Sequence, residues 1–216
     1  MAVTVHQYDL PDGIDWGDMV AIDSETMGLQ PHRDRLCVVQ LSSGDGNAHL
    51  VQFPRDGRPD TLTYAAPNLR AVLADENVTK LFHFARFDVA VLKKYLLVDC
   101  TPIYCTKIAS RLVRSYTDRH GLKDLCSELL RINLQKEQQS SDWGAASLTE
   151  AQVQYAASDV LHLHALKAAL DTMLAREGRA EIAQACFDFL PSRAALDLAG
   201  WDGVDIFAHS LSLIHI

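Results

Sequence analysis

Short apolar runs alternate with polar turns in the first half of the chain, whereas longer runs with helical spacing fill the second half. A short apolar run bounded by turn residues is typical of a buried strand, and apolar residues that recur every three or four positions are typical of an amphipathic helix. The predicted strands are Met19–Asp23, Leu36–Leu41, His49–Phe53 and Lys80–Phe84. The predicted helices are Pro67–Leu73 and Phe87–Leu97 and, after Pro102, about 106–114, 121–131, 148–175 and 179–189.

The longest predicted helix has a well-marked start. Ser147 and Glu150 match the S-x-x-E capping box, and a single apolar stripe runs from Val153 to Leu174. Strands that come first, with helices interleaved and then dominant, favour an α/β layered fold with a mixed sheet and a helical C-terminal part.

Composition indicates an ordinary globular chain. Of 216 residues, 48% are hydrophobic and 22% are charged, and no apolar run is long enough to span a membrane. The N-terminus lacks the basic and apolar regions of a signal peptide. The five cysteines contain no C-x-x-C pair, which favours reduced thiols, a cytoplasmic location and no zinc site. The net charge of −8 argues against a long electrostatic footprint on nucleic acid.

Two carboxylates stand at the end of the first predicted strand, in the segment Ile22 to Leu29. Alternate strand residues share one face, so Asp23 and Glu25 point the same way. Two neighbouring carboxylates repel each other, and a hard divalent cation would remove that cost. The alternative is that both acids are solvated where the strand enters a polar turn.

Two later segments carry further acids. Asp88 follows the fourth predicted strand, near the start of an apolar helix, where an acid can also simply complement the helix dipole. Tyr155 and Asp159 are four residues apart and share one helix face. Asp159 borders the buried stripe, so it needs a partner, which is either a neighbouring cation or backbone group or a bound metal.

Taken together, the D-x-E strand end, the later Asp88 and the Y-x-x-x-D helix resemble the DEDD superfamily of 3′–5′ exonucleases, in its tyrosine-bearing branch. The segments Lys136–Trp143, Leu148–Asp159, Ala109–Leu112 and Leu122–Cys126 look like ribonuclease D. The resemblance implies a ribonuclease H-like mixed sheet flanked by helices. It also implies that Asp23, Glu25, Asp88 and Asp159 bind two divalent ions, Mg²⁺ or Mn²⁺, while Tyr155 orients the attacking water.

The compact C-terminal region is similar to that of the nanoRNase C group, whose members degrade dinucleotides and other very short RNAs. We therefore expect a single 3′–5′ exonuclease domain over residues 1–210, with a catalytic core at about 18–175 and a helical extension at 176–210. The resemblance also implies a homo-oligomer, such as a ring-like octamer built from dimers. Residues 211–216 form an apolar tail with no recognised counterpart.

Substrate contacts are expected around the acids. Leu29 would wedge between bases, Met27, His83 and Phe87 would line the base pocket, and Arg111 or Arg114 would hold a 5′-phosphate. The full predicted set is Thr26, Met27, Gly28, Leu29, His83, Phe87, Arg111, Arg114 and Trp143. Each also has a structural reading: the apolar and aromatic residues as core or loop packing, and the arginines as a solvated helix face.

Three functions remain open from the sequence. The first is a hydrolase for very short RNA that releases nucleoside 5′-monophosphates. The second is a ribonuclease D-like enzyme that trims longer RNA 3′ ends, with DNA as a further substrate. The third is a catalytically silent nucleic-acid-binding protein. All four acids and the tyrosine are present, which argues against the third.

Overall fold

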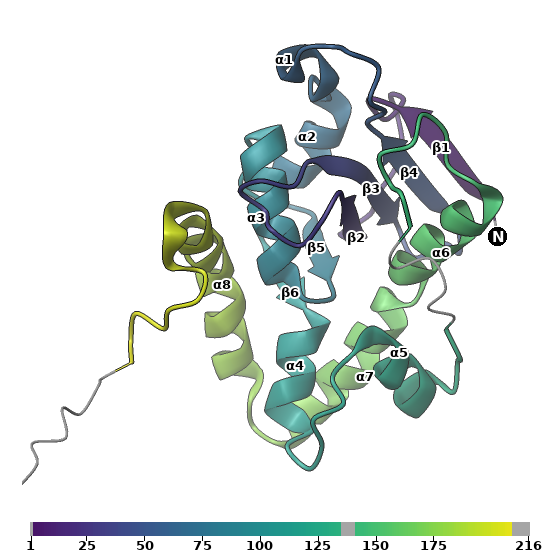
Figure 1. Cartoon of the computed structure of the whole chain (residues 1–216). Coiled ribbons are helices and arrows are strands. Elements are labelled where there is room, and N and C mark those ends of the chain that lie inside the picture. The colour runs from purple at the N-terminus through teal and green to yellow at the C-terminus, as the bar shows by residue number, and fades with distance from the viewer. Residues whose placement is uncertain (1, 135–140, 209–216) are drawn as a thin grey trace, which may run out of the picture.

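A six-stranded mixed sheet organises the chain (Figure 1). The computed structural model describes residues 2–134 and 141–208. The strand order is β1-β4-β3-β2-β5-β6. β3 pairs antiparallel with β2 and β4, and the other neighbouring strands are parallel. The strands are β1 (Val3–Gln7), β2 (Met19–Thr26), β3 (Leu36–Ser42), β4 (Ala48–Gln52), β5 (Thr79–Phe82) and β6 (Ile103–Cys105).

Helices cover both faces of this sheet. α3 and α6 lie on opposite sides of it in Figure 1. The helices are α1 (Asp60–Thr63), α2 (Pro67–Ala74), α3 (Ala85–Leu96), α4 (Thr106–Val113), α5 (Leu122–Leu125), α6 (Glu150–Leu161), α7 (Leu163–Arg176) and α8 (Ala180–Leu196), with π-helical turns η1 (Cys126–Leu130) and η2 (Asp197–Trp201). Because both faces are covered, every residue of β3 is buried.

The α/β fold class is confirmed, and the four predicted strands correspond to β2, β3, β4 and β5. The prediction missed the two strands at the sheet edges. β1 is largely solvent-facing, so it lacks an apolar run, and β6 is only three residues long. Such strands are fixed by backbone pairing with β4 and β5, which the local pattern does not reveal.

The capping box predicted at Ser147 and Glu150 was wrong. Thr149 is the N-cap of α6: its hydroxyl accepts from the Gln152 backbone N–H at 3.3 Å, and the Gln152 side chain accepts from the Thr149 N–H at 2.9 Å. A capping box is therefore present, but it begins two residues later than predicted.

Two predicted helix lengths were also wrong. The helix predicted at 148–175 is divided into α6 and α7 at His162, whose φ of −108° and ψ of −4° depart from regular helix geometry. α8 continues to Leu196, beyond the predicted end at 189, although it contains Pro191. α8 packs against α3, α4 and β6, and this contact compensates for the backbone hydrogen bond that proline cannot make.

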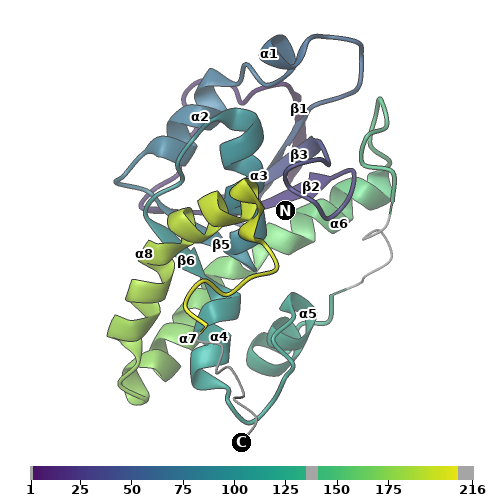
Figure 2. The ribbon, with the colours of Figure 1, turned by 60° about the vertical axis from the view of Figure 1, so that its left-hand side comes forward.

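Figure 2 shows α8 and the segment after it next to α3. Arg86 of α3 donates to both carboxylate oxygens of Asp197 at 2.6 and 2.8 Å, and Arg193 of α8 donates to the same carboxylate at 2.7 Å. These charge-assisted bonds attach the C-terminal extension to the helix that carries Asp88.

No helix in residues 2–134 or 141–208 combines the length and apolarity that crossing a membrane needs. The apolar tail 211–216 lies outside the described residues.

Candidate active site

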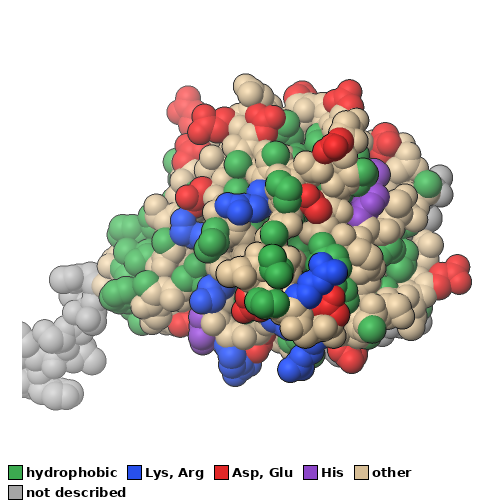
Figure 3. Space-filling model, turned by 90° about the horizontal axis from the view of Figure 1, so that it is seen from above, with side chains coloured by type: hydrophobic (Ala, Val, Ile, Leu, Met, Phe, Trp, Pro, Cys, Tyr) green, Lys and Arg blue, Asp and Glu red, His purple; other side chains and the backbone are tan. Residues whose placement is uncertain are grey.

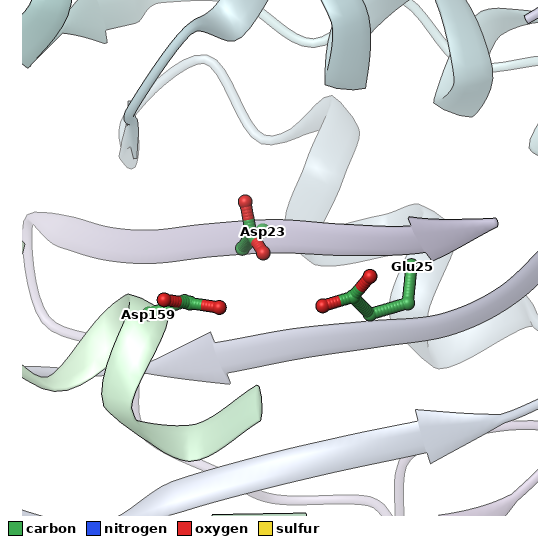
Figure 4. Close-up of side chains that lie close together, drawn as sticks. All are labelled: Asp23, Glu25 and Asp159. Carbon is green, nitrogen blue, oxygen red and sulfur yellow. The ribbon is translucent and has the colours of Figure 1, made fainter. Parts of the chain in front are cut away.

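Three carboxylates converge beside the central strand β2 (Figure 4). Asp23 and Glu25 project from the same face of β2, and Asp159 reaches them from α6. One oxygen from each of the three lies within 4.8 Å of the others. A cluster made only of carboxylate oxygens is the donor set that hard divalent cations prefer.

The end of β2 is irregular where the acids stand. The pairing of β2 with β3 shifts register between Glu25 and Thr26, and the Met27 N–H then donates to the Arg35 carbonyl at 3.0 Å. A bulge of this kind changes the direction of the side chains next to it. On the other side of Asp23, Gln40 of β3 donates an N–H to its carboxylate at 3.3 Å.

Asp88 completes the predicted four acids, but it lies outside the three-carboxylate cluster. It is in the first turn of α3, is 3% exposed, and accepts a hydrogen bond from the Ser24 hydroxyl at 2.6 Å. Ser24 stands between Asp23 and Glu25, so this bond fixes Asp88 against the same strand end. Burial, followed by the Asp23 charge, raises the pKa of Asp88.

Burial raises the pKa of every acid in the site, and repulsion raises the pKa values of Glu25, Asp88 and Asp159 further. Burial raises the pKa of Asp23 to about 7. Burial, together with the charges of Asp23, Asp159 and Asp88, raises the pKa of Glu25 to about 10. The pKa of Asp159 is raised by burial and by Asp23. Crowded carboxyl groups that resist ionisation are stabilised as carboxylates by a bound cation, so the residues present fit a divalent metal.

The raised pKa values and the expected metal binding should both make the stability of the protein depend on pH. Asp23 has an ordinary pKa of 3.8 and a folded pKa of about 7, so between these values the folded protein binds more protons than the unfolded chain. The free energy of unfolding of the metal-free protein should therefore fall as pH rises from about 4 to about 7. Mg²⁺ binds the ionised acids, so it should raise the melting temperature more at pH 8 than at pH 5. Thermal melts in Mg²⁺ and in EDTA measure both effects; equal Mg²⁺ shifts at the two pH values would contradict the assignment.

A cleft of about 620 Å³ opens over the acids. Seven of the nine predicted substrate-binding residues line it: Thr26, Met27, Gly28, Leu29, His83, Phe87 and Trp143. Leu29 is 84% exposed, so it is free to contact a ligand, and it does not plug the core. Gly28 has a further, structural role, because a Cβ at this position would collide with the Asp34 carboxylate.

Tyr155 and Trp143 form one wall of this cleft. Their ring centroids lie 6.0 Å apart, and Trp143 is only 3% exposed. The Trp143 indole N–H is buried without an acceptor among the described residues. Burial, followed by the charges of Asp159, Glu25 and Asp23, raises the pKa of Tyr155, so its hydroxyl keeps its proton and acts as a donor.

The two predicted arginines do not line the cleft. Arg114 is fully buried and bonds Glu128, the Ser110 hydroxyl and the Arg119 carbonyl, so the expectation that it holds a 5′-phosphate is wrong. Its guanidinium instead fastens the turn after α4. Arg111 lies in a neighbouring apolar groove between α4 and α8.

The cleft also contains residues outside the predicted substrate-binding set, of which Phe84 and Lys107 are the most informative. Phe84 is 45% exposed and adopts the left-handed conformation, with φ of 71°, directly before α3. A non-glycine residue in this conformation is unfavourable and often marks a functional site. The Lys107 ammonium lies 4.2 Å from the Phe84 ring centroid. Nothing in the sequence around His83 and Phe84 indicated this backbone conformation.

His83 is a neutral member of the cleft. Burial and the Lys107 charge lower the pKa of its imidazole to about 3. Its Nδ1 is 2.9 Å from the Thr106 hydroxyl. Lys107 and Lys123 are therefore the cationic side chains that line the cleft within the described part of the chain.

Comparison with known proteins identifies the family. A family model described as 3′-5′ exonuclease matches residues 12–175. The ribonuclease D of Acidiphilium cryptum is 35% identical over 161 residues, which are 74% of this chain and 39% of that protein. The chain thus spans about two fifths of the length of the curated relatives it matches.

Solved structures agree with this result. Brucella melitensis NrnC is 55% identical, with a TM-score of 0.90 over 97% of this chain and 100% of that one. NrnC has also been solved with bound Mg²⁺ and bound to pGG. Escherichia coli RNase D, at 25% identity, gives a TM-score of 0.69 over 82% of this chain and 45% of its own. The chain therefore belongs to the 3′–5′ exonuclease family that includes ribonuclease D and NrnC.

Proposed function

We propose that this exonuclease hydrolyses very short RNA, dinucleotides above all, and releases nucleoside 5′-monophosphates. The observation that supports this most directly is the likeness, over nearly the whole chain, to NrnC, which has been solved bound to pGG, a short RNA. The cleft itself is small, at about 620 Å³, and within the described residues it is lined by two lysines. A chain with a net charge of −8 and so few cleft cations has little means of holding many phosphates.

The cofactor that we propose is a pair of divalent ions, Mg²⁺ or Mn²⁺, which when bound would activate water and neutralise charge on the reacting phosphate and the leaving oxygen. Asp23, Glu25, Asp88 and Asp159 would hold these ions. Among the chain's own groups, Tyr155 donates a hydrogen bond that orients the attacking water. Leu29 and Phe87 pack against the bases, and Lys107 and Lys123 face the phosphates.

A length series tests this proposal. We expect the rate on 5′-phosphorylated RNA with Mg²⁺ to fall as length rises from two to about seven nucleotides, because a closed site contacts both ends of a small ligand and loses one set of contacts when the chain continues. Removal of the 5′-phosphate should weaken binding, since a charge-assisted contact is lost. Time courses on labelled RNAs, with a sample in excess chelator as the control, measure these rates.

If rate and affinity rise with length, the second candidate, trimming of longer RNA 3′ ends, replaces the first. The 35% identity with a ribonuclease D favours that candidate. Full activity in chelator would contradict the metal assignment but would leave the length preference unaffected.

We also propose self-association. The apolar groove between α4 and α8 has a volume of about 470 Å³, and Ile182 and Phe189 beside it are 55% and 36% exposed. Apolar surface of this kind is typical of an interface. A monomeric mass in sedimentation experiments would contradict it.

All five cysteines are free thiols, so we propose a reducing compartment, the cytoplasm, which cell fractionation would test.

A further inference from the structure

A further cavity, of about 480 Å³, lies between the loop that follows β2 and the segment that connects β4 to α1. Four arginines line it: Arg33, Arg35, Arg55 and Arg58. Figure 3 looks down on the end of the molecule that carries α1, where separate Lys and Arg side chains are visible over the middle and lower part of the face, with Asp and Glu among them. Such a concentration of positive charge is unexpected in a chain whose net charge is −8.

Two of these arginines are already paired with acids in the cavity wall. Arg33 makes two bonds to the Asp34 carboxylate, at 2.7 and 3.0 Å. Arg58 lies 3.0 Å from the carboxylate of Asp56. Asp56 also accepts from the Tyr8 hydroxyl, and this bond lowers the pKa of Asp56. The carboxylates of Asp34 and Asp56 therefore already interact with donor groups of the protein.

The other two arginines have no such partner. Within residues 2–134 and 141–208, no carboxylate lies within ion-pair distance of Arg35 or Arg55. The Arg35 guanidinium donates to the Phe53 carbonyl through Nη2, while Nη1 is buried without an acceptor. A buried donor that lacks an acceptor costs about 1–3 kcal/mol. Four arginines against three acids, Asp34, Asp56 and Asp60, leave the wall with a small excess of positive charge.

Local backbone structure fixes these groups around the cavity. Gly57 has a φ of +82°, and the Arg58 N–H donates to the Asp56 side chain at 3.1 Å, so the connecting segment turns sharply between Arg55 and Arg58. Arg35 is bonded through its carbonyl to the N–H of Met27, and Met27 lines both this cavity and the catalytic cleft. The two sites are adjacent, but the cavity contains none of the four catalytic acids.

We propose that this cavity binds the phosphate group of a nucleotide outside the catalytic cleft. A planar guanidinium presents paired N–H donors that match phosphate oxygens, and the exposed Arg55 can offer such a pair. Arg35, whose Nη1 is buried, adds positive charge behind the wall. The phosphate can come from a free nucleoside monophosphate, the kind of product that the enzyme releases, or from the backbone of a longer oligonucleotide. Asp60 also lines the cavity, but it is exposed, so solvent screens its repulsion.

Calorimetric titration of metal-free protein in EDTA tests the proposal. Without metal, the catalytic cleft lacks the ions that hold a phosphate beside its acids, and the two cleft lysines are unchanged in every variant, so the difference between variants reports on the arginine cavity. We expect AMP and inorganic phosphate to bind and adenosine not to bind. The substitutions Arg35→Gln and Arg55→Gln should each weaken AMP binding about tenfold. Arg70→Gln is the matched control, because Arg70 is exposed on α2 and does not line the cavity.

Arg55 is exposed, so Arg55→Gln and the charge reversal Arg55→Glu keep the test valid if Arg35→Gln fails to fold. AMP affinity that is the same in the Arg55 variants and in Arg70→Gln, or that is absent in all proteins, would overturn the proposal. A 5′-phosphorylated hexanucleotide identifies the source of the phosphate: tighter binding than AMP indicates an oligonucleotide backbone, and equal or weaker binding indicates a mononucleotide. Because the experiment needs neither metal nor turnover, its result is independent of the proposed substrate length.

Discussion

Replacement of Asp23 by asparagine should lower the turnover rate by more than 10²-fold. Residues that only support a metal ligand typically contribute 10- to 100-fold, so removal of a ligand at the centre of the cluster should cost more. Asp23 is that centre: burial raises the pKa values of Glu25, Asp88 and Asp159, and the Asp23 charge raises all three further. Single-turnover rates at saturating Mg²⁺ measure the loss.

The same substitution should make the metal-free protein more stable, because it removes one of several buried charges that repel each other. This pair of effects, lost activity with a higher melting temperature in EDTA, distinguishes a metal ligand from a residue that merely supports the fold. Asp99→Asn is the matched control, since Asp99 forms only an exposed ion pair with Lys93. A variant of Asp23 that keeps more than a tenth of the normal rate would remove it from the ligand set.

Replacement of Tyr155 by phenylalanine should lower the turnover number by about 10²–10⁴-fold, the usual contribution of a group that positions or transfers a proton. The ring packs against Trp143 and remains in the variant, so the fold and substrate affinity should change little. Because the pKa of Tyr155 is raised, its hydroxyl stays protonated, and the loss should be the same at pH 6 and at pH 9.

Separate measurement of the turnover number and of substrate binding checks this prediction. Tyr116→Phe is the control: it removes an exposed hydroxyl that donates to Glu128 at 2.7 Å, and Tyr116 does not line the cleft. Normal kinetics in Tyr155→Phe would show that Tyr155 has a structural role. A loss that grows steeply with pH would show instead that the phenolic oxygen acts as a base.

The segments that carry the catalytic residues could be recognised from local sequence, because each segment has its own pattern of residues. Strand periodicity places Asp23 and Glu25 on one face of β2, and the four-residue spacing places Tyr155 and Asp159 on one face of α6. Both relations depend only on backbone geometry over a few residues. The four strands with apolar runs were predictable for the same reason, whereas β1 and β6 depend on pairing partners distant in the chain.

Only the tertiary structure decided what surrounds each side chain. Arg111 and Arg114 lie on the same predicted basic helix, yet Arg114 is buried against Glu128 while Arg111 lines the groove between α4 and α8. Arg35 and Arg55 are 20 positions apart, and no sequence pattern linked them. In the folded chain, the loops after β2 and β4 bring them to one cavity. Periodicity determines the direction of a side chain relative to its own backbone. Burial, charge pairing and pKa depend on neighbours that only the folded chain supplies.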